Sequence, residues 1–144
     1  MYYIRKMCLD DYEEVVNMFY DFYKEVHSNR IIGYKYRFYE TVIEWVNENK
    51  DIVVCVKGDT IVGFTMSYII SNGLTKPFYQ CEIAYVKPKY RKTRASYLLY
   101  NNAVNYAKEN NLLIVTNSRI ENGVSDMVQK HFGCKATYTV NEKE

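Results

Sequence analysis

The chain has 144 residues, 48% of them hydrophobic, and a net charge of +2, which predicts one folded domain over residues 1–144 and gives no global sign of a nucleic-acid partner. No apolar run is long enough to span a bilayer and the N-terminus is no signal peptide, so we expect a cytoplasmic protein without a membrane partner. Four scattered cysteines without a C-x-x-C pair and only two histidines predict reduced thiols and no metal site.

The N-terminal third predicts a strand and two helices. Residues 2–7 form a short strand, and a helix follows from Asp10 to about residue 25, with Asp10 and Glu13 spaced as a capping box. After a loop over residues 26–33, a second helix runs to about residue 49. Both helices carry apolar residues at helical spacing for burial: Val15, Met18, Phe19 and Phe22 in the first, and Phe38, Val42, Trp45 and Val46 in the second.

The middle of the chain predicts a sheet. Residues 52–57 and 60–70 are β-branched runs joined by Gly58-Asp59, which indicates a hairpin, and Gly63 indicates a bulge or a close backbone contact. Another strand follows a loop over residues 71–77, and a last short one covers residues 112–116 after a long helix. A right-handed crossover makes this last strand parallel to its predecessor, and the change from antiparallel to parallel pairing opens the sheet for a ligand.

A basic turn connects that strand to the long helix. The strand stops at Pro88, and four cations occupy six residues after it: Lys89, Arg91, Lys92 and Arg94. An apolar stripe at helical spacing begins at Ala95. A helix N-terminus attracts anions, so cations at its start predict a phosphate site. The alternative is a solvated basic turn, which is what most charge clusters are.

This segment resembles the coenzyme A-binding motif of the GNAT family of N-acetyltransferases, approximately Val-x-Pro-x-x-Arg/Gln-x-x-Gly-x-Gly/Ala before a helix. Val86, Pro88 and Arg91 are in register, while Arg94 and Ser96 replace the two glycines. The resemblance implies an α/β (α+β) fold, with a mixed and mostly antiparallel sheet of about six strands flanked by about four helices. It also implies transfer of an acetyl group from acetyl-CoA to a primary amine, without a metal.

The resemblance also implies which residues bind the coenzyme. They are the backbones of Ala84, Tyr85 and Val86, the turn and helix start Arg91, Lys92, Thr93, Arg94, Ala95 and Ser96, and Asn122 and Gln129. Two outcomes are open where the glycines are missing. Either Lys92 and Arg94 hold the pyrophosphate and Ser96 adds a hydroxyl, or the site has lost its ligand and only the fold remains. We favour the first, because loss of function would not be expected to keep cations there.

The catalytic groups implied by the family are only partly present. Glu82 is the single acid on its strand, and alternation places it on the same face as Ala84 and Val86, where its pKa would rise and suit a general base. The other interpretation is a solvent-facing strand glutamate. Gln129 replaces the tyrosine that protonates the leaving thiolate in many members. Because glutamine has no titratable proton, a water or another tyrosine, such as Tyr138, must serve.

The C-terminal segment predicts one helix and one strand. Residues 122–134 match the last family helix, with Gly133 as its C-cap, and only residues 134–140 remain for a strand. The family usually has two strands here, so we expect a homodimer through the C-terminal sheet edge.

The acceptor that the resemblance implies is a small-molecule or peptide amine. A second hypothesis is a catalytically weak or inactive GNAT-like binding or regulatory module.

Overall fold

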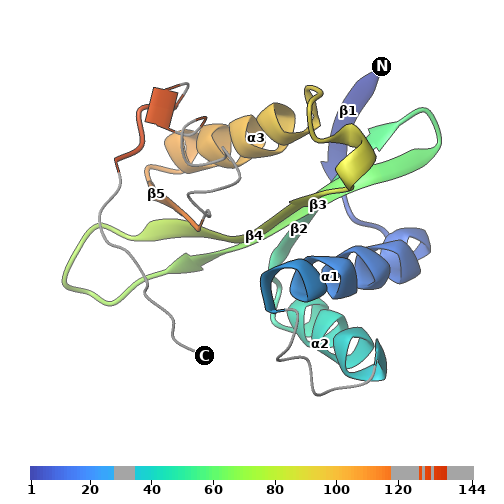
Figure 1. The fold of residues 1–144 in the computed structure, drawn as a ribbon. Coiled ribbons are helices and arrows are strands. Elements are labelled where there is room, and N and C mark those ends of the chain that lie inside the picture. The colour runs from blue at the N-terminus through green and yellow to red at the C-terminus, as the bar shows by residue number, and fades with distance from the viewer. Residues whose placement is uncertain (28–34, 118–126, 128, 131, 136–144) are drawn as a thin grey trace.

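In the computed structural model, five strands form one mixed sheet in the order β1-β2-β3-β4-β5 (Figure 1). The structure describes residues 1–27, 35–117, 127, 129, 130 and 132–135. The strands are β1 (Tyr2–Lys6), β2 (Asp51–Lys57), β3 (Thr60–Ile70), β4 (Phe78–Val86) and β5 (Leu113–Thr116). Pairing is antiparallel from β1 to β4, and β5 is parallel to β4. The predicted hairpin and the predicted parallel last strand are both confirmed.

Helices cover the two faces of the sheet. The helices α1 (Tyr12–His27) and α2 (Lys35–Asn47) lie on one face, and α3 (Ala95–Glu109) lies on the other (Figure 1). On the first face, residues such as Val15, Phe19 and Trp45 pack against Phe64 and Tyr85 of the sheet. On the second face, Ala95, Leu99, Ala103 and Ala107 of α3 pack against residues of β2, β3 and β4. Each helix therefore buries most of the apolar stripe that its sequence spacing predicts.

The fold class expected from the sequence is confirmed. The described residues contain five strands and three α-helices, against about six and about four expected from the family. Met127, Gln129, Lys130 and Phe132 are helical, where the last helix is predicted, while most of the predicted final strand lies outside the described residues. Among the helices that the structure describes, none is both long and apolar enough to cross a membrane.

Two local predictions near the N-terminus are wrong. The first is Val46, predicted to be buried but 41% exposed, because it lies to one side of the α2 face that buries Phe38, Val42 and Trp45. The second is the capping box of Asp10 and Glu13. A 3₁₀ turn, η1 (Leu9–Asp11), precedes α1, and Asp11 instead accepts a hydrogen bond from the backbone N–H of Cys8 at 2.8 Å.

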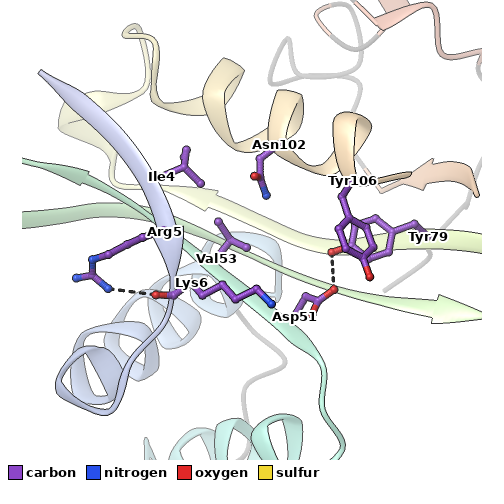
Figure 2. Close-up of a pocket in the computed structure, with 8 residues that line it drawn as sticks. All are labelled: Ile4, Arg5, Lys6, Asp51, Val53, Tyr79, Asn102 and Tyr106. Atoms are coloured by element: carbon purple, nitrogen blue, oxygen red, sulfur yellow. Dashed lines mark hydrogen bonds between the residues drawn. The ribbon is translucent and has the colours of Figure 1, made fainter. Parts of the chain in front are cut away.

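The α3 face is not packed over its whole area. A cavity of about 220 Å³ lies between β1, β2, β4 and α3 (Figure 2). Its walls are Ile4, Arg5 and Lys6 of β1, Asp51 and Val53 of β2, Tyr79 of β4, and Asn102 and Tyr106 of α3. The cavity therefore opens between the first edge strand and the helix that crosses the sheet.

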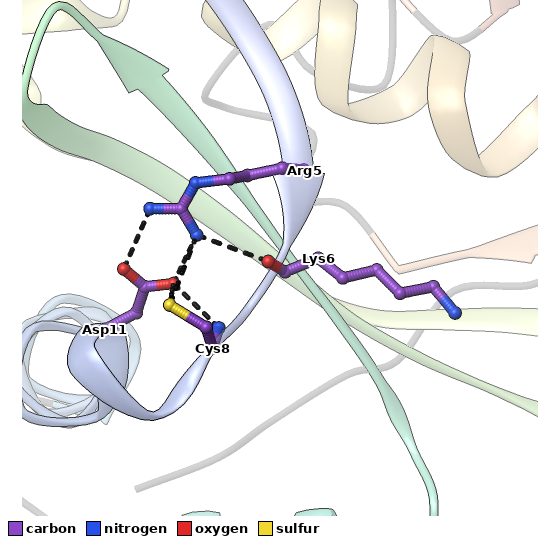
Figure 3. A network of polar contacts seen from close by, with 4 residues as sticks. All are labelled: Arg5, Lys6, Cys8 and Asp11. Carbon is purple, nitrogen blue, oxygen red and sulfur yellow. Dashed lines mark hydrogen bonds and ion pairs between the residues drawn. The ribbon is translucent and has the colours of Figure 1, made fainter.

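Asp11 joins β1 to the start of α1 (Figure 3). Its carboxylate receives hydrogen bonds from Arg5 Nη1 at 2.5 Å and Nη2 at 2.9 Å, in addition to the Cys8 N–H. The residue is only 4% exposed. The Arg5 guanidinium, helped by the Cys8 N–H, lowers the pKa of Asp11 from 3.8 to about 2 against the opposing effect of burial. The carboxylate therefore stays charged in the folded protein under mildly acidic conditions.

This network predicts an acid-sensitive part of the stability. Because the pKa of Asp11 is lower in the folded than in the unfolded chain, the carboxylate favours folding above about pH 4, and this contribution disappears as the pH falls toward 2. The difference corresponds to about 2 kcal/mol. We expect Asp11→Asn to be less stable than wild type by about this amount in urea unfolding at about pH 7. Between about pH 7 and about pH 3, the free energy of unfolding should fall less in Asp11→Asn than in wild type. The same pH dependence in both proteins would contradict the assignment.

Candidate functional site

The end of β4 has a free edge on its β5 side. Pairing between β4 and β5 stops at Cys81 and Thr116, after which Asn117 N–H donates to Cys81 O at 3.3 Å, yet β4 continues to Val86. Lys87 N–H donates to Val62 O of β3, so by strand alternation the main-chain groups of Val86 and Ala84 point away from β3. Within the described part of the chain, no strand pairs with this edge of β4.

A bulge in β4 lies where the free edge begins. Ile83 is opposite Met66 and Cys81 is opposite Ser67, so Glu82 has no partner in β3. An extra residue of this kind bends a strand and redirects the side chains that follow it. The bulge therefore marks the point at which β4 separates from β5.

The bulge changes which face of the sheet each side chain occupies. Ala84 and Val86 pack toward α3, whereas Tyr85 packs into the core under α1 and α2. Glu82 is exposed, and its carboxylate lies close enough to Tyr68 to act on that phenol, which packs against the α1 and α2 core. The predicted common face of Glu82, Ala84 and Val86 is therefore wrong, because regular alternation does not continue through a bulge.

The Glu82–Tyr68 contact joins a carboxylate to a phenol on the α1 and α2 face. Burial raises the pKa of Tyr68, and the Glu82 carboxylate raises it further. The phenol therefore stays protonated beside Glu82. Tyr68 is therefore a neighbour of the carboxylate that the sequence selects as a general base.

The basic turn has the predicted position before α3. It comprises the 3₁₀ turn η3 (Pro88–Tyr90) and residues 91–94, and it leads directly into the first residue of α3. Thr93 Oγ1 donates to Tyr90 O at 2.6 Å and accepts from Ala95 N–H at 3.3 Å, which stabilises the turn and gives the first N–H of α3 a partner. The half-buried Ser96 lies in the first helical turn, where amide N–H groups have no partner inside the helix.

The cations of this turn have different environments. Arg91 Nε donates to Val86 O at 2.7 Å, its Nη2 pairs with Glu25 at 2.5 Å, and its guanidinium lies 5.3 Å from the Tyr85 ring centre. Arg91 is therefore held against β4 and α1. Lys92 and Arg94 are exposed, and no ion pair joins either to another described residue. These two cations remain available to an anion at the helix start.

Comparison with known proteins identifies the family. A model of the acetyltransferase (GNAT) family matches residues 12–124, most of the chain. The chain belongs to the GNAT acetyltransferase family. A comparison with curated protein sequences finds no match.

Solved GNAT-like structures share the fold over nearly their whole length. A transcriptional regulator from Bacillus halodurans C-125 is 18% identical, with a TM-score of 0.78 and coverage of 100% of this chain and 99% of that chain. A ribosomal-protein-alanine N-acetyltransferase from Brucella melitensis biovar Abortus 2308 is 14% identical, with a TM-score of 0.75 and the same coverages. Aminoglycoside N-acetyltransferase AAC(6')-Iy in complex with CoA is 16% identical, with a TM-score of 0.74 and coverages of 100% and 94%.

The C-terminal part of the GNAT motif is only partly described. Gln129 is exposed and helical, while Asn122 and Tyr138 lie outside the described residues. Phe132 stacks on Tyr97 of α3 with ring centres 5.4 Å apart, so this segment packs beside α3. Gly133 has φ +68°, the left-handed conformation of a helix C-cap glycine, as predicted.

The contacts of Arg91 also predict an effect on folding. Sequence reasoning alone predicts that Arg91→Ala weakens coenzyme binding with little effect on folding. The structure adds a charged hydrogen bond to Val86 O, so we expect Arg91→Ala to lose about 1–2 kcal/mol in urea unfolding. The Glu25 contact is partly exposed and adds little. Glu25→Gln is the matched control, and an equal loss in both variants would assign the effect to the ion pair instead.

Proposed function

We propose that this GNAT protein transfers an acetyl group from acetyl-CoA to a primary amine. The observation that carries the proposal is the free edge of β4 from Glu82 to Val86, next to a helix start with two available cations. An extended amide-containing arm needs backbone partners, and a diphosphate needs positive charge. The two requirements are met at adjoining positions in the fold.

In this proposal the coenzyme is held by the end of β4 and the start of α3. Main-chain groups of Ala84 and the N–H of Val86 pair with the pantetheine arm, while Arg91 holds the Val86 carbonyl and Tyr85 has its main-chain groups directed to β3. Lys92, Arg94 and the Ser96 hydroxyl bind the diphosphate. Arg94 has φ −73° and ψ −7°, an ordinary helical conformation, so a side chain is accepted without strain where the family has glycine. The residues at the end of β4 and the start of α3 therefore suit the coenzyme.

The chemistry forms a bond between the acceptor nitrogen and the acetyl carbon and breaks the carbon–sulfur bond of the thioester. Glu82, beside Tyr68, takes a proton from the amine directly or through a water, and the departing thiolate takes a proton from water. A main-chain N–H at the free edge of β4 polarises the thioester carbonyl. Gln129 takes no part in proton transfer, since an amide does not titrate.

The acceptor is proposed to approach from the face that carries Glu82, which is also the face of α1 and α2. Tyr36 and Tyr39 of α2 are 67% and 44% exposed, and Tyr39 lies 4.8 Å from the Tyr12 ring. Exposed tyrosines on this face are able to contact an amine or its scaffold. Either a small-molecule amine or a peptide amine suits this surface.

The alternative function is a GNAT-like regulatory module that binds the coenzyme weakly or without turnover. Two departures from the family pattern favour it: Arg94 and Ser96 in place of glycines, and Gln129 in place of the acid. One structural neighbour, from Bacillus halodurans, is described as a transcriptional regulator. The transferase predicts stabilisation by acetyl-CoA and release of a thiol, whereas the regulatory module predicts weak or no stabilisation and no release.

Two measurements separate these functions. Thermal unfolding with acetyl-CoA at about a hundred times its Kd is expected to show a stabilisation of about 2.7 kcal/mol. A thiol-release assay then uses a polyamine, a lysine peptide and an aminoglycoside as acceptors, with Glu82→Gln as the comparison. Stabilisation with thiol release supports the transferase, whereas no stabilisation, or stabilisation without release, overturns the transferase and supports the regulatory module.

A further inference from the structure

The cavity on the α3 face is separate from the proposed coenzyme site. Its walls come from β1, the start of β2, the start of β4, and the middle of α3. None of the residues assigned to the coenzyme or to catalysis lines it. In Figure 2, the Lys6 side chain extends along one rim with its ammonium toward Asp51, and Asn102 points down from α3.

The polar groups of the cavity have opposite charges on neighbouring walls. One oxygen of the Asp51 carboxylate, Oδ2, accepts a hydrogen bond from the Tyr79 hydroxyl at 2.9 Å, which leaves Oδ1 for another donor. Among the described residues, no ion pair within 4.0 Å involves the Lys6 ammonium. Arg5, the other cation, is neutralised by Asp11. The cavity therefore presents one carboxylate and one ammonium.

The tyrosine beside Asp51 is built into the core. Tyr79 is 3% exposed and packs against Tyr106, with ring centres 4.6 Å apart and the rings tilted by 38°. Burial raises the pKa of Tyr79, and the Asp51 carboxylate raises it further, so the hydroxyl remains a donor to Asp51. The carboxylate is thus held in one orientation by a rigid partner, while Ile4, Val53 and the Tyr106 ring supply apolar walls.

We propose that this cavity binds a free amino acid. The ligand's ammonium would pair with Asp51 Oδ1 and its carboxylate with Lys6 and the Asn102 amide, while its side chain contacts Ile4 and Val53. A zwitterion matches the balanced charges, whereas a simple anion or cation leaves one of the two wall charges unpaired. At about 220 Å³ the cavity lies below the range of drug-sized sites, about 300–1,000 Å³, which favours a small ligand.

Calorimetric titration of the intact protein with each of the common L-amino acids tests the proposal, with acetate and methylamine as single-charge probes. At least one amino acid is expected to give saturable binding that exceeds both probes. Lys6→Met and Asp51→Asn are each expected to weaken it about tenfold to a hundredfold, the loss of one charged hydrogen bond. Asp51→Asn keeps an oxygen for Tyr79, and Lys108→Met, an exposed lysine of α3 outside the cavity, is the matched control expected to bind normally.

Three results would overturn the proposal: no saturable binding of any amino acid, binding that both cavity variants leave unchanged, or acetate binding as tightly as the amino acid. The thermal shift with acetyl-CoA is measured on the same variants. Because Lys6 and Asp51 lie outside the coenzyme site, this shift should equal that of wild type, so failure of the amino-acid site and failure of the proposed transferase are distinguishable.

Discussion

Acetyl-CoA should bind at least a hundredfold more weakly to a Lys92→Glu, Arg94→Glu double variant than to wild type. Both cations are exposed in the turn that leads into α3, and no ion pair with the described residues engages them. A hydrogen bond to a charged group contributes about 1.5–3 kcal/mol, so two such contacts amount to about 3–6 kcal/mol. Reversing the charges adds repulsion of the phosphates at the helix start.

Calorimetric titration with acetyl-CoA at two salt concentrations measures this effect. The matched control is Lys35→Glu, Lys108→Glu, which makes the same change in net charge at exposed positions of α2 and α3 away from the turn. Wild-type binding should weaken with added salt, and the double variant should show less salt dependence. An equal loss in the control would assign the effect to net charge, and no loss in the double variant would remove the phosphate assignment.

Gly63→Ala is expected to destabilise the fold by about 1–3 kcal/mol. A Cβ at this position would lie 2.7 Å from the backbone oxygen of Tyr85, 3.0 Å from Val86 Cγ2 and 3.3 Å from Leu99 Cδ1. The first contact involves backbone, which does not move away as a flexible side chain does. Either β3 or β4 must therefore shift. A β-bulge of β3 lies beside this position, between the partners of Cys55 and Val56.

Urea unfolding at neutral pH measures this loss, with Gly58→Asn as the comparison. Gly58 has φ +61° and no atom within 4 Å of its Cβ position, and asparagine tolerates this conformation, so this variant should change stability little. Because the displaced strand carries the free edge, Gly63→Ala should also weaken acetyl-CoA binding. Wild-type stability in Gly63→Ala would contradict the close contact of β3 with β4.

Much of the fold follows from local sequence. The β2–β3 hairpin and the long helix after the basic turn are set by turn residues and by the period of apolar residues, which act over a few positions, and the crossover rule then makes the last strand parallel. The position of the basic turn also has a local cause, since Pro88 ends a strand and Ala95 begins an apolar stripe. The glycine at position 63 was recognisable as a constraint, although its contacts were not.

What the sequence by itself determined is therefore the order of the elements, the two apolar faces of the sheet and the basic start of α3. Only the tertiary structure decided that Arg91 is held by Val86 and Glu25, that the bulge at Glu82 turns its carboxylate toward Tyr68, and that the Asp11 carboxylate binds Arg5 and the Cys8 N–H ahead of α1. These outcomes depend on partners distant in sequence or on an added residue in a strand. Periodicity carries no information about either, because it describes neighbours along one element and not the packing between elements.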